Sequence, residues 1–260
     1  MRSAIAATIL LCLARDVRRR PKSARPFLVA VAFAATMLLF VLSSRATTAA
    51  NAVFLQSTAP LYVLVLGPLL LRERLERRDL VPLIGMGLGL ALLLAAPMEP
   101  GEARATAPDP ALGNALAAVG GATWALSILG LRWISNERTA TLFVVAVGNA
   151  VVFLCTLPFA WPIAFGGTAD LLVMLWLGVF QIGLAYLCVS RGIGGVSAFE
   201  ASLLFLVEPV LNPVWAWLVH GEVPGDLALF GGVLILACAV HVAFARRRPP
   251  EAPLPVRLRG

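Results

Sequence analysis

The stretch from Phe199 to Glu222 reads FEASLLFLVEPVLNPVWAWLVHGE, and it decides what kind of protein this is. It is long and apolar enough to cross a bilayer as one helix, because about 20 mainly apolar residues span the hydrocarbon core. Yet it contains a carboxylate, Glu208, directly before Pro209, and Pro213 follows one turn later. Proline removes a backbone donor and clashes with the preceding turn, so we expect the helix to bend or break near its middle.

Two carboxylates in this stretch are candidates for function. Glu208 either satisfies backbone groups freed at the bend or lines a polar cavity. An ionisable group at membrane depth is by default a site candidate, which makes Glu208 the first choice for handling a proton or a cation. Glu200 lies about two turns earlier, nearer the cytoplasmic end. A role at a cytoplasmic mouth and plain solvation at the interface are both open for Glu200.

The same pattern occurs a second time, which indicates an internal duplication. Residues 51–74 read NAVFLQSTAPLYVLVLGPLLLRER, and at an offset of 149 Pro60 matches Pro209 and Glu73 matches Glu222. Each copy is followed by an acid and a glycine-containing apolar helix, beginning at Asp79 and Asp226. A duplicated membrane unit is the usual plan of a secondary transporter.

The composition indicates an all-α, polytopic membrane protein. The chain is 60% hydrophobic and only 13% charged, whereas a soluble domain is about one-quarter charged. The net charge of +7 does not indicate nucleic-acid binding, because the charges sit in short loops between apolar runs. No metal site or cofactor is expected, since the two histidines are far apart and the four cysteines show no metal spacing. We interpret the cysteines as small buried hydrophobic residues; they are Cys12, Cys155, Cys188 and Cys238.

Hydropathy and charge together predict nine helices in two inverted repeats. The apolar runs are 1–14, 27–44, 47–71, 80–97, 111–134, 139–161, 169–190, 196–220 and 226–245. Of the 21 basic residues, 18 lie in alternate loops and the tail, and the other 3 are Arg2, Arg45 and Arg104. This bias places the C-terminus in the cytoplasm. The helix with Pro60 then runs inward and its twin with Pro209 runs outward, so the repeats are inverted.

The predicted domains follow from these runs. Residues 1–97 form a first repeat with four helices, incomplete at its N-terminus, and residues 111–248 form a second repeat with five. Residues 98–110 are a polar, proline-containing external linker. The basic tail at 249–260 is expected to be cytoplasmic and to meet anionic lipid heads.

Three pieces of sequence resemble a known family. They are STAPLYVLVLGPLLLRERL, GNALAAVGGATWALSILGLRW, and SLLFLVEPVLNPVWAWLVHGEV followed by LFGGVLILACAV. Together they look like the EamA family of the drug/metabolite transporter superfamily, and the resemblance covers nearly the whole chain. It implies ten helices in two inverted five-helix repeats, with small metabolites moved across the membrane, often driven by protons. The chain departs from that plan by lacking a first helix, for which we expect a late start codon, with a fragment or a true nine-helix variant as alternatives.

Several polar and aromatic residues are further candidates for the pathway. Asn51 and Gln56 lie on the twin helix, where hydrogen bonding between helices is the alternative role. Trp124 lies mid-helix, and an aromatic wall suits apolar or cationic substrates. Asn149, Gln181 and Tyr186 are expected either to face a central cavity or to pack in the core with one satisfied hydrogen bond. The pairs Gly85/Gly89 and Gly231/Gly232 are expected to permit close helix contacts.

The residues therefore favour a secondary transporter, with export of small metabolites or drugs by alternating access as the leading hypothesis. The alternative is a non-transporting or inactive membrane protein. An enzyme is disfavoured because the sequence shows no nucleophile, metal cluster or phosphate loop. The expected partners are a small-molecule substrate and membrane lipids, with a homodimer considered and nucleic acid excluded. The expected location is the bacterial inner membrane.

Overall fold

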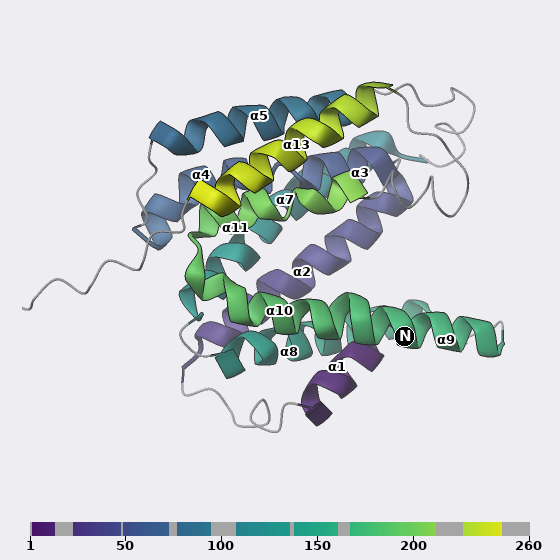
Figure 1. Ribbon diagram of the computed structural model, residues 1–260. Helices are drawn as coiled ribbons and strands as arrows, with labels where there is room; N and C mark the ends of the chain where they lie inside the picture. The colour runs from purple at the N-terminus through teal and green to yellow at the C-terminus, as the bar shows by residue number, and fades with distance from the viewer. Residues whose placement is uncertain are drawn as a thin grey trace, which may run out of the picture.

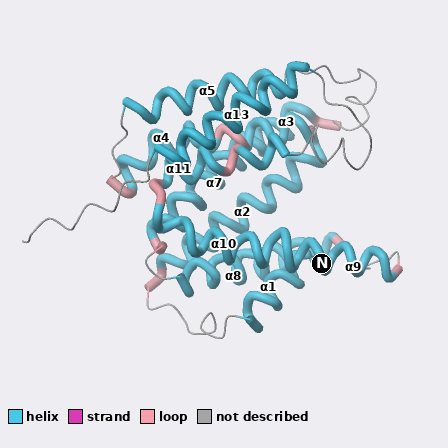
Figure 2. Tube along the Cα trace, viewed as in Figure 1, coloured by secondary structure: helices cyan, strands magenta, loops and turns pink. Residues whose placement is uncertain are grey.

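The computed structural model is all-helical in the part of the chain that it describes (Figures 1 and 2). It describes residues 2–13, 23–47, 49–72, 77–94, 108–135, 138–160, 167–211 and 226–245. The helices of the first half are α1 (Arg2–Leu13), α2 (Arg25–Ala46), α3 (Ala49–Gln56), α4 (Ala59–Leu70) and α5 (Arg77–Leu94). Those of the second half are α7 (Pro110–Trp133), α8 (Arg138–Thr156), α9 (Thr168–Trp176), the π-helix η3 (Leu177–Leu184), α10 (Ala185–Gly192), α11 (Ala198–Leu204) and α13 (Asp226–Ala245).

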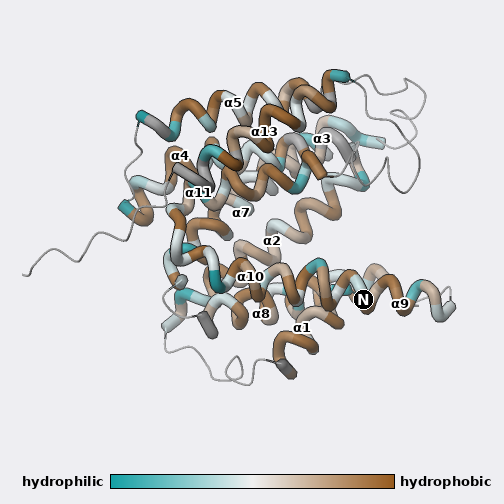
Figure 3. The backbone as a smooth tube through the Cα atoms, viewed as in Figure 1, coloured by the Kyte–Doolittle hydropathy of each residue, from teal (hydrophilic) through white to brown (hydrophobic). Residues whose placement is uncertain are grey.

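Four of these helical stretches are long and apolar enough to cross a membrane. They are Arg25–Ala46, Pro110–Trp133, Ala140–Phe159 and Thr168–Gly195. Figure 3 shows apolar residues along most of the length of the helices, with hydrophilic residues towards ends such as those of α5. Large apolar side chains are exposed on outward faces, for example Leu28 and Leu69, as expected for a surface covered by lipid. The protein is an integral membrane protein, as the composition predicted.

Both proline-containing runs are broken near their middle. In the first run, α3 ends at Gln56, a turn follows, and α4 begins at Ala59 with Pro60 in its first turn. Proline is well tolerated there because the first turn of a helix has no internal partner for its N–H groups. In the second run, α11 ends at Leu204, residues 205–206 form a turn, and helix resumes at residues 207–211 around Pro209. Pro213, Glu73 and Glu222 lie outside the described residues.

The last helices of the two repeats pack against each other through glycines. A Cβ added to Gly85 on α5 would lie 2.5 Å from Sγ of Cys238 on α13. A Cβ added to Gly89 would lie 2.7 Å from the backbone oxygen of Gly231. The later residue of α5, Gly89, thus meets the earlier residue of α13, Gly231. The two helices are therefore antiparallel (Figure 1). This direction is the one expected for inverted repeats, and the close contacts predicted for these glycines are confirmed.

A second antiparallel pair, α2 and α7, forms the centre of the molecule. Gly130 on α7 faces Val29 near the start of α2, and Gly113 faces Thr47 just beyond its end. The pair is tied at one end by a hydrogen bond of 2.9 Å from the Thr47 hydroxyl to the amide oxygen of Asn114. Phe33 on α2 is 1% exposed and packs between these helices and α8.

The cysteines differ from their predicted environment. Cys12, Cys155 and Cys188 are exposed on the outer surface of their helices, and Cys238 is half-buried between α5 and α13. The prediction of buried cysteines is therefore wrong for Cys12, Cys155 and Cys188. For the three exposed thiols, however, the outward faces of a membrane protein are apolar too, so hydropathy alone does not distinguish core from lipid contact.

Candidate functional site

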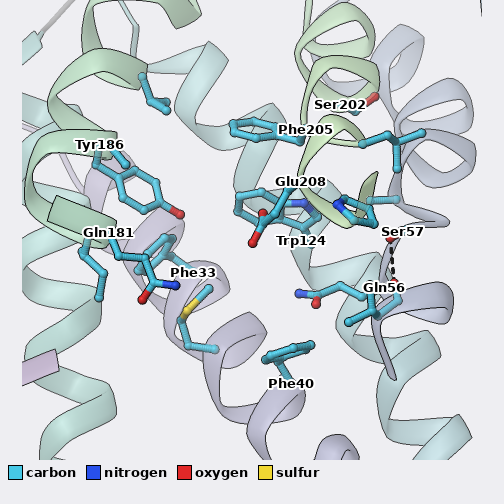
Figure 4. Close-up of a pocket in the computed structure, with 18 of the residues that line it drawn as sticks. Phe33, Phe40, Gln56, Ser57, Trp124, Gln181, Tyr186, Ser202, Phe205 and Glu208 are labelled. Atoms are coloured by element: carbon cyan, nitrogen blue, oxygen red, sulfur yellow. Dashed lines mark hydrogen bonds between the residues drawn. The ribbon is translucent and has the colours of Figure 1, made fainter. Parts of the chain in front are cut away.

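A cavity of about 520 Å³ lies where the two broken helices meet. It is bounded by α1 and by helices of both repeats, and Figure 4 shows its labelled side chains. Pro60 and Pro209 both line it, so each break opens onto the same space. The lining residues are Arg2, Phe33, Met37, Phe40, Val53, Gln56, Ser57, Ala59, Pro60, Trp124, Gln181, Ile182, Ala185, Tyr186, Val189, Ser202, Phe205, Leu206, Glu208 and Pro209.

Glu208 projects into the cavity from the residues that follow the break in the second run. Its backbone N–H donates to the carbonyl of Phe205. In Figure 4 the carboxylate is directed into the cavity, towards the hydroxyl of Tyr186. Among the described residues the carboxylate has no hydrogen-bond or ion-pair partner. The charged group is thus available to a molecule in the cavity.

A π-helix forms the opposite wall of the cavity, and no local sequence pattern predicted it. The third span of the second repeat changes from α to π geometry at Leu177–Leu184 and back to α at Ala185. Gln181 lies within the π segment and Tyr186 just beyond it, and both face the cavity (Figure 4). The Tyr186 ring packs edge-on against Phe33, with ring centroids 5.3 Å apart. Local π geometry is rare and is frequently found at functional sites.

Arg2 is a site residue that sequence analysis missed. We predicted it to lie on the external side, but it lines the cavity and its Nη1 donates to Oε1 of Gln181 over 3.0 Å. No local pattern in the sequence indicates this contact, because Gln181 lies 179 positions away from Arg2.

Aromatic rings form much of the remaining wall. Trp124 from α7 and Phe205 from the break in the second run lie with ring centroids 5.1 Å apart. Gln56 lies near them with its amide directed into the cavity (Figure 4). The neighbouring hydroxyls are already engaged, since Ser57 donates to Val53 and Ser202 to Phe199. The polar groups open to a ligand are therefore few, and they face apolar surface.

Other predicted candidates do not line the cavity. Glu200 is 4% exposed and forms a capping box with Ser197 at the start of α11, so it is not solvated at the interface. Asn149 is 1% exposed on α8, where its amide nitrogen donates to the Val145 carbonyl, and its Oδ1 has no partner among the described residues. The side chain of Asn51 lies outside the described part of α3.

The fold and the cavity together define a helical membrane protein built from two repeats around a central cavity. The chain belongs to the EamA-like transporter family, whose match covers residues 1–95 and 111–244. This is a family of transporters and not of enzymes. A solved crystal structure is similar with a TM-score of 0.75 and 20% sequence identity, over 96% of this chain and 87% of that one. That similarity supports the fold alone.

Curated relatives are 24–26% identical in sequence. An uncharacterized transporter of Clostridium kluyveri is 26% identical over 75% of this chain and 63% of its own length. An uncharacterized transporter of Methanothermobacter thermautotrophicus is 24% identical over 76% of this chain and 58% of its own length. The pseudopaline exporter CntI of Pseudomonas aeruginosa is 26% identical over 76% of this chain and 67% of its own length. The chain thus spans about three-fifths of the first two relatives.

Proposed function

We propose that this protein is a secondary transporter that exports small organic metabolites through the central cavity. The observation that supports this most strongly is the position of the cavity at both helix breaks, between the two repeats. Transporters with inverted repeats bind substrate near mid-membrane at broken helices, and they alternate access by moving one repeat against the other. Export is the direction suggested by the relative that carries the name of an exporter.

Glu208 is the residue we propose for energy coupling. It is a carboxylate without a partner among the described residues, and it faces the cavity that a substrate would enter. Such a group can bind either a proton or a cationic group of the substrate, but not both. Competition between the proton and the substrate for Glu208 produces proton–substrate exchange, because a proton that enters from outside displaces the substrate. The expected location is the bacterial inner membrane, with the C-terminus in the cytoplasm.

Transport can be tested with inside-out membrane vesicles that contain the full chain. When the interior is made acidic, we expect uptake of radiolabelled metabolites from a panel of amino acids, nucleosides, sugars and organic cations. Collapse of the proton gradient should abolish this uptake. If correctly folded protein moves no compound on the panel, a non-transporting membrane protein becomes the better description.

A cavity-filling variant ties transport to this site. Ala185 lines the cavity, so Ala185→Phe should occupy space that a substrate needs and lower uptake about tenfold or more, which corresponds to a loss of about 1.4 kcal/mol or more of binding free energy. Ala237→Phe on α13 is the matched control, since Ala237 is exposed and does not line the cavity. Equal rates in the two variants, both well folded, would exclude the cavity as the route.

A further inference from the structure

Gln181 and Tyr186 face the same cavity although they lie five positions apart in one span (Figure 4). In an α-helix, residues five positions apart point about 140° away from each other around the helix axis. In a π-helix, whose hydrogen bonds join residues five apart, they lie on nearly the same side. This segment has such bonding, since the N–H of Ala185 donates to the carbonyl of Phe180. The π geometry therefore brings both side chains to one wall.

The N-terminal part of the π segment packs closely on α1. A Cβ added to Gly178 would lie 2.7 Å from the Ile5 side chain and 3.3 Å from the Arg2 carbonyl oxygen, so a larger residue would force α1 to shift. The Arg2 guanidinium also donates to the Gln181 side chain, with 3.0 Å between Nη1 and Oε1. These two contacts fix which side of the segment faces α1.

The other end of the segment is fixed by α2. The Tyr186 ring packs edge-on against Phe33, with ring centroids 5.3 Å apart, and its hydroxyl points across the cavity towards Glu208 (Figure 4). One residue more or less rotates one end of an α-helix by about 100° against the other. An α-helix with the same number of residues would therefore lose either the contact of Gly178 with α1 or that of Tyr186 with α2. The π geometry satisfies both contacts.

We propose that α1 positions Tyr186 in the cavity by holding this span in π geometry. Gly178, through its packing on α1, and Arg2, through its bond to Gln181, are positioning residues. Without their contacts the span returns to α geometry, and the Tyr186 hydroxyl turns away from Glu208. The inference rests on the proposed function only in the coupling role of Glu208, because the geometry of the span can be measured without transport.

The two tyrosines of the chain provide the measurement. The full chain with 3-fluorotyrosine in nanodiscs gives one fluorine NMR signal for Tyr62 and one for Tyr186, and Tyr62→Phe assigns them. Gly178→Ala should move the Tyr186 signal, because the ring loses its contact with Phe33, and should leave the Tyr62 signal in place. Gly183→Ala is the matched control, since its Cβ would meet only an oxygen of its own segment, 3.4 Å away, and should move neither signal.

Arg2→Met tests the second contact. Methionine keeps much of the length of the side chain and removes the donor to Gln181. We expect the Tyr186 signal to move as in Gly178→Ala, and uptake by inside-out vesicles of a compound that the wild type transports to fall several-fold. A Tyr186 signal at its wild-type position in both folded variants would refute the proposal.

Deletion of one residue provides a rescue that a purely structural defect would not show. Leu184 lies in the π segment, is 49% exposed and does not line the cavity. Its deletion leaves Gln181 and Tyr186 four positions apart, which is one face of a plain α-helix. Adding this deletion to Arg2→Met should therefore restore the Tyr186 signal and most of the uptake. Deletion of Leu172, an exposed residue of α9 before the segment, is the control and should restore neither.

The results separate this inference from the proposed function. If the deletion of Leu184 restores the Tyr186 signal of Arg2→Met but not its uptake, Arg2 acts directly on the substrate and its positioning role is wrong. If the signals follow the expected pattern while the wild type transports no compound, the role of α1 stands and the transport function falls. If the wild type transports and the signal of Tyr186 is the same in all variants, transport stands and the inference is wrong.

Discussion

Two glutamates eight residues apart show how local context decides the role of a side chain. Glu208 precedes a proline at a break, and its carboxylate faces the cavity. Glu200 accepts a hydrogen bond of 2.8 Å from the Ser197 backbone at the start of α11. The Ser197 and Glu200 spacing is a capping-box pattern that is visible in the sequence. Our prediction missed it because the apolar run was read as a continuous span.

The coupling role of Glu208 predicts the behaviour of a conservative variant. Glu208→Gln keeps the shape of the side chain and removes its charge, so folding should survive while the pH dependence of transport is lost. Proton-driven uptake should fall about tenfold or more, since a charge-assisted contact contributes roughly 1.5–3 kcal/mol. The measurement is the uptake rate in vesicles across mildly acidic to mildly basic buffers.

Glu200→Gln is the matched control for that experiment. A capping box accepts glutamine in place of glutamate, so stability and pH dependence should both stay near wild type. Glu200→Ala should instead lower stability by about 1 kcal/mol and leave the pH profile unchanged. A Glu208→Gln variant with a normal rate and a normal pH profile would remove Glu208 from the mechanism.

At the scale of elements, the breaks in both repeats were predictable and the π-helix was not. Proline predicts a helix break because it lacks a backbone N–H and its ring clashes with the preceding turn. Both breaks fall within a few residues of Pro60 and Pro209. The π segment at Leu177–Leu184 contains no proline. Within it, Gly178 lies close to Ile5 of α1, because a Cβ added there would be 2.7 Å from the Ile5 side chain, and such tertiary contacts leave no local pattern.

The α5–α13 contact gives a matched pair of glycine substitutions. A Cβ at Gly89 would lie 2.7 Å from a backbone oxygen of Gly231, which cannot move cheaply, so Gly89→Ala should destabilise the protein by about 1–3 kcal/mol. A Cβ at Gly87 meets nothing within 4 Å, so Gly87→Ala should be neutral or stabilising by up to about 1 kcal/mol. Thermal unfolding in detergent measures both, and a reversed order would show that this interface is not close-packed.

At the scale of the whole molecule, the duplication seen at an offset of 149 predicted the overall plan. The antiparallel α5 and α13 agree with inversion, and the family match falls in two segments. The cavity residues from distant parts of the chain were harder to predict. Arg2 and Gln181 are 179 positions apart, and nothing in either local pattern indicates that they meet. A side chain such as Asn149 has the same sequence context whether it faces a cavity or a neighbouring helix.

The orientation in the membrane remains a prediction, and it rests on 18 basic residues on one side against 3 on the other. Arg2 lines the cavity and therefore does not count as an external charge. The charge bias becomes stronger, because only Arg45 and Arg104 are then left on the predicted external side. A reporter that fluoresces only in the cytoplasm should be bright when fused after Gly260.

Because α5 and α13 are antiparallel, the end of α5 and the start of α13 lie on the same side of the membrane. The same reporter inserted at residues 98–107, or directly before Asp226, should therefore be dark in both positions. A dark but full-length fusion after Gly260 would reverse the orientation, whereas opposite signals from the two inserted reporters would contradict the inverted arrangement itself.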